Sequence, residues 1–161
     1  MSMKSVFDSF EKDHDRLDAH FGEFQRLKRT DFPAAKADFK AFMFGLRRHI
    51  VWEEEILFPV FEKATGMRDA GPTAVMRHEH VLIKLRLDAL HEKVRAADPD
   101  CDAEAQALLA VLKDHNMKEE QILYPAIDRM LAPGELAAVE SAMAAIPEQQ
   151  GCGCGHANAH G

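Results

Sequence analysis

The sequence predicts an all-α protein: an up-down-up-down antiparallel four-helix bundle followed by a short fifth helix. Apolar residues recur every three or four positions through four long segments, which is the period of an amphipathic helix, and no segment alternates as a strand would. Short connections join the four segments, which favours antiparallel neighbours. With 161 residues and a hydrophobic content of 47%, the chain is expected to form one domain with a substantial core.

The first predicted helix runs from about Val6 to Lys28, and His14 fills a gap in its apolar series. The second follows the turn that ends at Pro33. Its predicted inward face consists of Phe39, Phe42, Met43, Leu46, His49, Glu53, Leu57, Val60 and Phe61. Pro59 is expected to kink this helix one turn beyond the polar pair, and Gly66 marks its end.

The third predicted helix opens at Gly71-Pro72-Thr73, and the break Asp98-Pro99-Asp100 separates it from the fourth. The inward face of the third is Met76, His80, Ile83, Leu87, Leu90 and Val94. That of the fourth, which begins near Asp102, is Leu108, Leu109, Leu112, His115, Glu119, Ile122, Leu123 and Ile127. Pro125 is expected to repeat the kink. The fifth helix, Pro133 to about Ile146, packs through Leu136, Val139 and Met143.

We expect the helical domain to occupy residues 1–147 and a flexible Cys/His/Gly-rich tail to occupy residues 148–161. The tail places Cys152, Cys154, His156 and His160 close together, a pattern that could capture a soft or borderline metal ion. A solvated, glycine-rich terminus without a metal is the alternative interpretation. The odd count of three cysteines does not indicate a disulfide framework.

The charge and hydropathy of the chain argue against several classes of partner. A formal net charge of -7 without a basic run disfavours nucleic acid and anionic membranes as partners. No apolar run approaches the roughly 18 residues of a membrane span, and the first residues lack the apolar region of a signal peptide. We therefore expect a cytoplasmic protein, with a possible homodimer surface at Val75, Leu82 and Leu85.

A repeat with an offset of 66 residues organises the candidate site. His49 precedes Glu53 by four residues, and His115 precedes Glu119 in the same way. On a helix this spacing stacks the two side chains on one face, about 6 Å apart along the axis. The same offset relates His14 to His80, so each half of the chain contributes one histidine and one HxxxE pair.

These six polar residues occupy core positions, which indicates a metal site. A carboxylate inside an apolar bundle costs several kcal/mol unless it is paired or bound to a metal ion. Mixed imidazole and carboxylate ligands suit iron, manganese or zinc. Four histidines and two glutamates exceed the needs of one tetrahedral zinc ion and suit two metal ions with shared carboxylates. We therefore predict a dinuclear site, with iron as the leading candidate.

Other polar residues compete for the same role. His78 lies two residues before His80, but on a weaker apolar series, and it breaks the 66-residue offset. Glu54, Glu55 and Glu120 flank the HxxxE pairs and are expected to face solvent or a neighbouring helix. Two aromatic residues near the site, Trp52 and Tyr124, are expected to pack or to line a channel rather than to carry redox chemistry.

The pattern H…HxxxE…H…HxxxE, formed by His14, His49, Glu53, His80, His115 and Glu119, resembles that of the bacterial hemerythrin-like (HHE cation-binding) proteins. The resemblance covers roughly residues 5–146. It implies a four-helix bundle around a non-haem di-iron centre, in which Glu53 and Glu119 bridge the ions and the four histidines are terminal ligands. The ferritin-like alternative needs Glu-x-x-His on two helices, and only Glu11 to His14 fits.

Departures from the oxygen-carrying members of the family affect the expected function. Those members have an HxxxH pair on the third helix, whereas Met76 and Lys84 stand four residues before and after His80. The resemblance implies a protein that reversibly binds or senses oxygen, nitric oxide or a related small oxidant. The alternatives are a di-iron enzyme that turns over peroxide or oxygen, and an iron-handling or iron–sulfur stress protein.

Overall fold

The computed structural model describes residues 2–148, and within that range the chain is helical and contains no strand. Four helices form the bundle: α1 (Val6–Leu27), α2 (Phe32–Trp52), α4 (Pro72–Arg95) and α5 (Asp102–Lys118). Short helices extend its second and fourth members, namely α3 (Phe58–Thr65) and α6 (Tyr124–Met130), and α7 (Pro133–Ala144) follows. The predicted all-α bundle with a short last helix is confirmed. Residues 149–161 of the predicted tail, with its four candidate metal ligands, lie outside the described residues.

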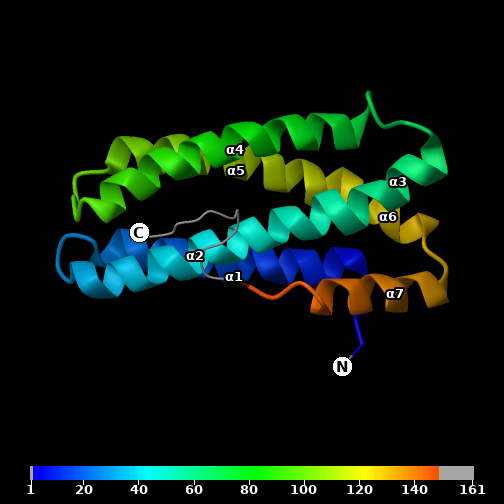
Figure 1. Cartoon of the computed structure of the whole chain (residues 1–161), viewed down its shortest axis with the longest axis horizontal. Coiled ribbons are helices and arrows are strands. Elements are labelled where there is room, and N and C mark those ends of the chain that lie inside the picture. The colour runs from blue at the N-terminus through cyan, green and yellow to red at the C-terminus, as the bar shows by residue number, and fades with distance from the viewer. Residues whose placement is uncertain (1, 149–161) are drawn as a thin grey trace.

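Two helical hairpins make up the bundle. Helix α1 packs mainly on α2, and α4 packs mainly on α5. Figure 1 shows the two pairs side by side with both hairpin turns at the same end of the molecule. At the opposite end, α3 and α6 are neighbours and α7 lies beside the N-terminal part of α1. The internal repeat of the sequence therefore appears as two copies of one hairpin.

Local capping fixes where the helices of the first hairpin begin. The side chain of Ser5 accepts a hydrogen bond from the backbone N–H of Asp8, and Asp31 caps α2 through Ala34 in the same way. The carboxylate of Asp128 on α6 accepts bonds from the first two N–H groups of α1, at 2.7 and 3.0 Å. This last contact ties the start of the chain to the end of the second hairpin.

A π-helical turn interrupts each long inner helix at the candidate site. The two turns, η1 (Glu53–Leu57) and η2 (Glu119–Leu123), are related by the repeat, and each is followed by a proline as the second residue of the next helix. Proline has no N–H to give to the carbonyl four residues earlier. Instead, the N–H groups of Phe58 and Tyr124 bond the carbonyls of Glu53 and Glu119, five residues earlier. The irregularity thus starts at the glutamates, not one turn beyond them as predicted.

The widened turn also explains one wrong prediction. Ile122 was expected to face inward, but its side chain is 59% exposed. A π-turn holds about one more residue than an α-turn, so the residue three places after Glu119 rotates outward. Leu123 and Tyr124 face the interior instead and are buried.

The core is divided into two apolar clusters with the polar residues between them. One cluster, toward the hairpin turns, contains Leu17, Leu46, Ile83 and Leu112. The other, toward α7, contains Phe10, Trp52, Met76 and Leu123. Each histidine of the repeat therefore sits between an apolar residue of one cluster and an apolar residue of the other on its own helix. This arrangement isolates the polar layer from water on both sides along the bundle axis.

Gly45 and Gly22 offer a test of how closely the first hairpin is packed. A methyl group at Gly45 would lie 2.5 Å from Cδ2 of Leu17, which is only 3% exposed, whereas one at Gly22 would meet nothing within 4 Å. We expect Gly45→Ala to lower the free energy of unfolding by about 1–3 kcal/mol through overpacking. Gly22→Ala is expected to raise it by about 0.5–1 kcal/mol. Urea denaturation of both variants measures this, and equal effects would contradict the packing.

No helix among residues 2–148 has the length and hydrophobicity that a membrane span requires. The surface proposed for dimerisation is exposed on α4, with exposed fractions of 46% for Val75, 37% for Leu82 and 60% for Leu85. Dimerisation through this surface stays a prediction.

Candidate metal centre

Six side chains from the two hairpins converge in the polar layer. They form two overlapping groups whose candidate ligand atoms lie within 4.8 Å of one another: His14, His49, Glu53 and Glu119 in one, and Glu53, His80, His115 and Glu119 in the other. All six are buried, and the two glutamates are only 1% and 0% exposed. These are the residues that the sequence repeat singled out. Each group combines the two histidines of one hairpin with both glutamates.

Each glutamate faces both groups. Glu53 places Oε2 3.3 Å from Nε2 of His49 and Oε1 3.0 Å from Nε2 of His80. Glu119 does the same, with Oε1 3.3 Å from Nε2 of His14 and Oε2 3.1 Å from Nε2 of His115. A carboxylate with one oxygen toward each of two metal positions has the geometry of a bridging ligand.

The outer nitrogen of every histidine donates a hydrogen bond to a carboxylate on another helix. Asp13 and Glu79, which the repeat relates to each other, accept from Nδ1 of His49 and His115, both at 2.8 Å. The second related pair, Glu54 and Glu120, accepts from Nδ1 of His80 and His14, both at 2.7 Å. Because Nδ1 carries the proton, each ring presents Nε2 to the interior. Glu54 and Glu120 therefore contact a histidine of a neighbouring helix and orient its ring.

Carboxylates at both nitrogens raise the pKa of three of these imidazoles, those of His49, His80 and His115. Burial alone lowers the pKa of His49, but the charge of Glu53 and the hydrogen bond to Asp13 raise it to about 10. At His80, burial again lowers the pKa, and the bonds to Glu53 and Glu54 raise it to about 9. Their Nε2 atoms can therefore hold positive charge in the polar layer, either as a bound proton or as a bound metal cation.

Tyr124 is part of this site, although the sequence suggested only packing or a channel lining. Its fully buried hydroxyl donates to Oε2 of Glu53 at 2.5 Å and lies 2.9 Å from Oε1 of Glu119. Burial and the charges of these two glutamates raise the pKa of Tyr124 well above its usual value. An α-helical period does not place a residue five positions after Glu119 on the same face; the π-turn does. Proline at position 125 was the available signal.

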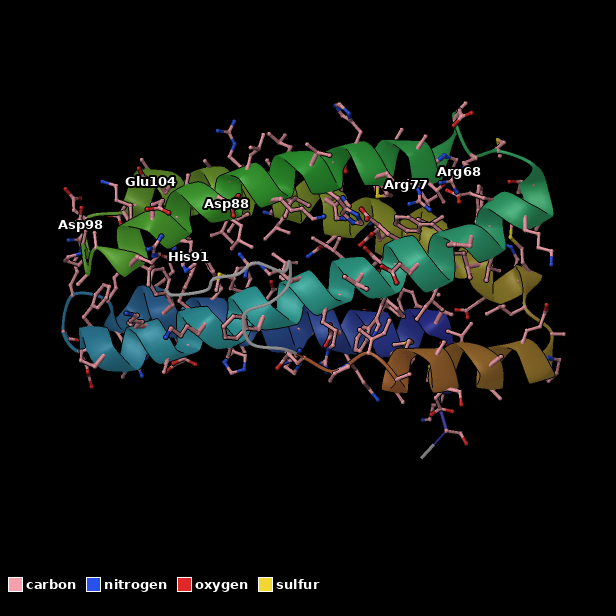
Figure 2. The ribbon with its side chains drawn as sticks, in the orientation of Figure 1. Arg68, Arg77, Asp88, His91, Asp98 and Glu104 are labelled. Carbon is pink, nitrogen blue, oxygen red and sulfur yellow. The ribbon has the colours of Figure 1, made fainter. Side chains whose placement is uncertain are left out.

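Arg77 of α4 holds the first π-turn from outside. Its guanidinium donates to the carbonyl oxygen of Glu54 at 3.2 Å, lies 5.4 Å from the ring centre of Phe58 and pairs with the buried Glu62. Figure 2 shows Arg77 between α4 and the segment around α3, with Arg68 nearby. Arg68 pairs with the same carboxylate, 3.2 Å from Nη1 to Oε1. These contacts fix the backbone that carries Glu53.

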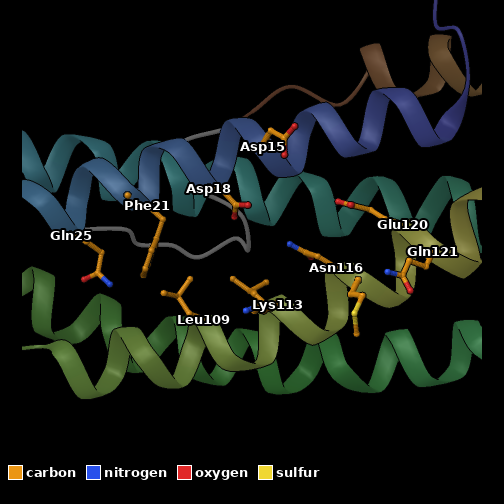
Figure 3. Close-up of a pocket in the computed structure, with 12 residues that line it drawn as sticks. Asp15, Asp18, Phe21, Gln25, Leu109, Lys113, Asn116, Glu120 and Gln121 are labelled. Atoms are coloured by element: carbon orange, nitrogen blue, oxygen red, sulfur yellow. The ribbon is translucent and has the colours of Figure 1, made fainter.

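A groove of about 580 Å³ approaches the site between α1 and α5. Figure 3 shows its lining residues, with Asp15 and Asp18 on α1 facing Lys113 and Asn116 on α5. Glu120, which holds His14, also lines this groove. The groove therefore ends at the carboxylate that holds the His14 ring from outside.

The other candidate residues lie away from the centre. His78 is exposed, so of the two neighbouring histidines only His80 joins the cluster. Glu55 is exposed as well. Trp52 packs in the core and donates its indole N–H to the carbonyl of Met143 at 3.1 Å. The proposed tail ligands Cys152, Cys154, His156 and His160 lie outside the described residues.

The donor set fits a pair of metal ions. Two buried carboxylates face four imidazole nitrogens. Among the described residues, Oε2 of Glu119 has no hydrogen-bond partner, although Nε2 of His115 lies 3.1 Å away. An orphaned buried carboxylate oxygen is costly unless a cation satisfies it. Nitrogen and oxygen ligands in this ratio suit iron, manganese or zinc.

The fold and the cluster together define a helical-bundle, metal-binding protein with its site at the bundle centre. The family comparison names the class more closely: the model of the hemerythrin HHE cation-binding domain matches residues 5–127. The chain belongs to this hemerythrin family. All six His and Glu residues of the candidate cluster lie within the matched range.

Curated relatives are similar over parts of their length. A hemerythrin-like protein of Schizosaccharomyces pombe is 29% identical over 134 residues, which are 83% of this chain and 64% of that protein. Iron-sulfur cluster repair proteins YtfE of Yersinia pestis and Yersinia pseudotuberculosis are 32% identical over 63 residues, which are 39% of this chain and 28% of theirs. The chain thus covers less than two thirds of each of these relatives. No solved structure gives a significant match.

Proposed function

We propose that this chain binds two iron ions between His14, His49, His80, His115, Glu53 and Glu119, and that this centre reversibly binds or senses oxygen, nitric oxide or a related small oxidant. The observation that carries the proposal is the position of the two glutamates, each with one oxygen toward each histidine pair. Iron is favoured by the mixed nitrogen and oxygen ligands and by the family's cation-binding domain.

Bound iron would supply an exchangeable coordination position and one-electron redox chemistry. The residues of the chain do the rest. Asp13, Glu54, Glu79 and Glu120 hold the imidazoles with Nε2 inward, and the apolar clusters on either side exclude water. The groove between α1 and α5, at about 580 Å³, is large enough to hold a diatomic molecule or peroxide beside Glu120. These features support binding of a small ligand rather than processing of a large substrate.

A second candidate function is protection or repair of iron–sulfur clusters. It is favoured by the similarity of 63 residues to the Yersinia proteins that are named for that activity. Only 28% of the length of those proteins is matched. Cluster repair is therefore the alternative function for this chain and not the leading one. Transfer of iron to an apo iron–sulfur protein would favour it over ligand binding.

The proposal is tested with full-length protein loaded anaerobically with iron(II). We expect two iron ions per chain and a change in visible absorption on adding oxygen or nitric oxide that reverses under argon. The two neighbouring histidines of α4 give a matched pair of variants: His80→Ala is expected to lose at least one iron, whereas the exposed His78→Ala keeps both. Absorption spectra and iron analysis provide the readouts.

Two outcomes would contradict the proposal. Sustained consumption of hydrogen peroxide over many turnovers, without a stable ligand-bound spectrum, would favour the enzyme alternative. Iron-loaded protein that shows no spectral response to oxygen or nitric oxide would exclude the binding function and leave only metal storage or transfer.

A further inference from the structure

Tyr124 brings an additional oxygen atom into only one of the two metal positions. Its hydroxyl lies 3.2 Å from Nε2 of His49, 3.4 Å from Nε2 of His14, 2.5 Å from Oε2 of Glu53 and 2.9 Å from Oε1 of Glu119. These four atoms belong to the group formed by His14, His49 and the two glutamates. The phenol oxygen is therefore surrounded by candidate metal ligands.

The four distances, from 2.5 to 3.4 Å, scatter around the spacing of neighbouring ligands on one ion. When metal–ligand bonds are about 2.1 Å long, two ligands at a right angle are about 3.0 Å apart, and an octahedral ligand has four such neighbours. A hydroxyl group, by contrast, has one proton and cannot donate to both glutamates at once. A cation next to the phenol oxygen would instead be within reach of all four neighbouring ligand atoms at once.

The internal repeat supplies a natural comparison for this residue. The residue that the repeat aligns with Tyr124 is Phe58, which has no hydroxyl. Its ring stacks on His80, with centroids 5.7 Å apart and an angle of 15° between the planes. The position held by His80 and His115 therefore also has two histidines and the same two glutamates, but it lacks a fifth ligand atom from the π-turn.

From this juxtaposition we propose that Tyr124 is a ligand of the iron ion held by His14 and His49, and that the ion held by His80 and His115 keeps the open position where a small ligand binds. The inference rests on the proposed di-iron function and adds one point to it: the two ions are not equivalent. Coordination forms a bond from the phenol oxygen to iron(III) and breaks its O–H bond, with the proton passing to the buffer and no electron transferred. A cation in direct contact stabilises the phenolate, as metal ions do for bound water and thiols.

The test uses full-length protein loaded with iron(II) and oxidised with ferricyanide, as wild type, Tyr124→Phe and Phe58→Tyr. Wild type is expected to show a phenolate-to-iron(III) absorption band and tyrosinate vibrations in resonance Raman spectra. Tyr124→Phe is expected to lose both signals and to bind iron about 10–100-fold more weakly, while reaching two ions per chain at saturating iron. Phe58→Tyr, which adds the hydroxyl at the repeated position, is expected to intensify the band.

Azide titration gives a second readout that does not depend on tyrosine. Wild type is expected to bind one azide per chain, Tyr124→Phe two, and Phe58→Tyr none. If Tyr124→Phe does not fold, the wild-type Raman spectrum and the Phe58→Tyr variant still decide the question.

The results separate the two claims. Two iron ions without tyrosinate vibrations would overturn the role of Tyr124 and leave the proposed function standing. Tyrosinate vibrations that persist in Tyr124→Phe would also overturn it, because Tyr124 is the chain's one tyrosine and the signal would then have another origin. A folded chain that binds no iron would overturn the proposed function and this inference with it.

Discussion

Glutamine at position 53 is expected to lower the affinity of the chain for iron on the order of a thousandfold at both metal positions. Glu53 is buried and places one oxygen toward each histidine pair, so its charge is shared by both ions. Removing one partner from a buried charge pair costs about 3–5 kcal/mol, and each 1.4 kcal/mol is about a tenfold change in affinity. Iron titration monitored by calorimetry under argon measures the change.

The next two glutamates provide graded controls for this experiment. Glu54 orients His80 from outside, so Glu54→Gln is expected to weaken iron binding about 10–100-fold. Glu55 is exposed, and Glu55→Gln is expected to leave the affinity unchanged. Three equal affinities would show that the polar layer does not hold iron. A larger effect at Glu55 than at Glu53 would place the binding site on the surface of η1.

Removal of iron is expected to produce the second large effect, a loss of folding stability. The metal-free chain must keep Glu53, Glu119 and four imidazoles buried with only protons to balance their charges. A ligand that binds only the folded state stabilises it by about 4 kcal/mol when its free concentration is a thousandfold above its Kd. With urea slopes of about 1–3 kcal/mol per molar, the unfolding midpoint of the loaded chain should rise by more than about 1 M.

Urea denaturation under argon, with iron(II) or with a chelator, measures this difference. Glu53→Gln serves as the control, because its midpoint should respond only weakly to iron at the same concentration. Identical midpoints for loaded and chelated wild type would mean that the polar layer is stable without a cation, which contradicts the account.

Sequence periodicity alone predicted the bundle because the determining pattern is local. The apolar faces of the four helices, the cap region before Pro33 and the helix end at Gly66 all depend on residues within a turn or two of one another. The 66-residue offset then related the two hairpins and selected His80 over its neighbour His78, which the structure places at the surface. The helix bounds agree with the prediction to within a few residues.

The sequence could not show how the two hairpins face each other. The bonds of Asp13, Glu54, Glu79 and Glu120 to histidines cross between helices, so no spacing along one helix reveals them. The offset does relate Asp13 to Glu79 and Glu54 to Glu120, and that was the available signal. The assignment of His14 with His49 to one group likewise needed the assembled bundle.

The π-turns account for the other differences between prediction and structure. Patterns with a period of 3.6 residues assume a regular helix, and each turn at the glutamates adds a residue that breaks the period. Ile122 was therefore assigned to the core, and Tyr124 was expected only to pack or to line a channel near the site. Prolines at positions 59 and 125 indicated an irregularity, but not that it begins six residues earlier, at Glu53 and Glu119.

The measurement that bears most directly on the account is the metal content of the full-length chain, purified under native conditions without chelators and analysed by elemental analysis and native mass spectrometry. Two iron ions per folded chain are the expected result. A well-folded helical chain that carries no metal, and takes up none when iron(II) is added, would contradict the claim that cations occupy the space between the buried imidazoles and carboxylates.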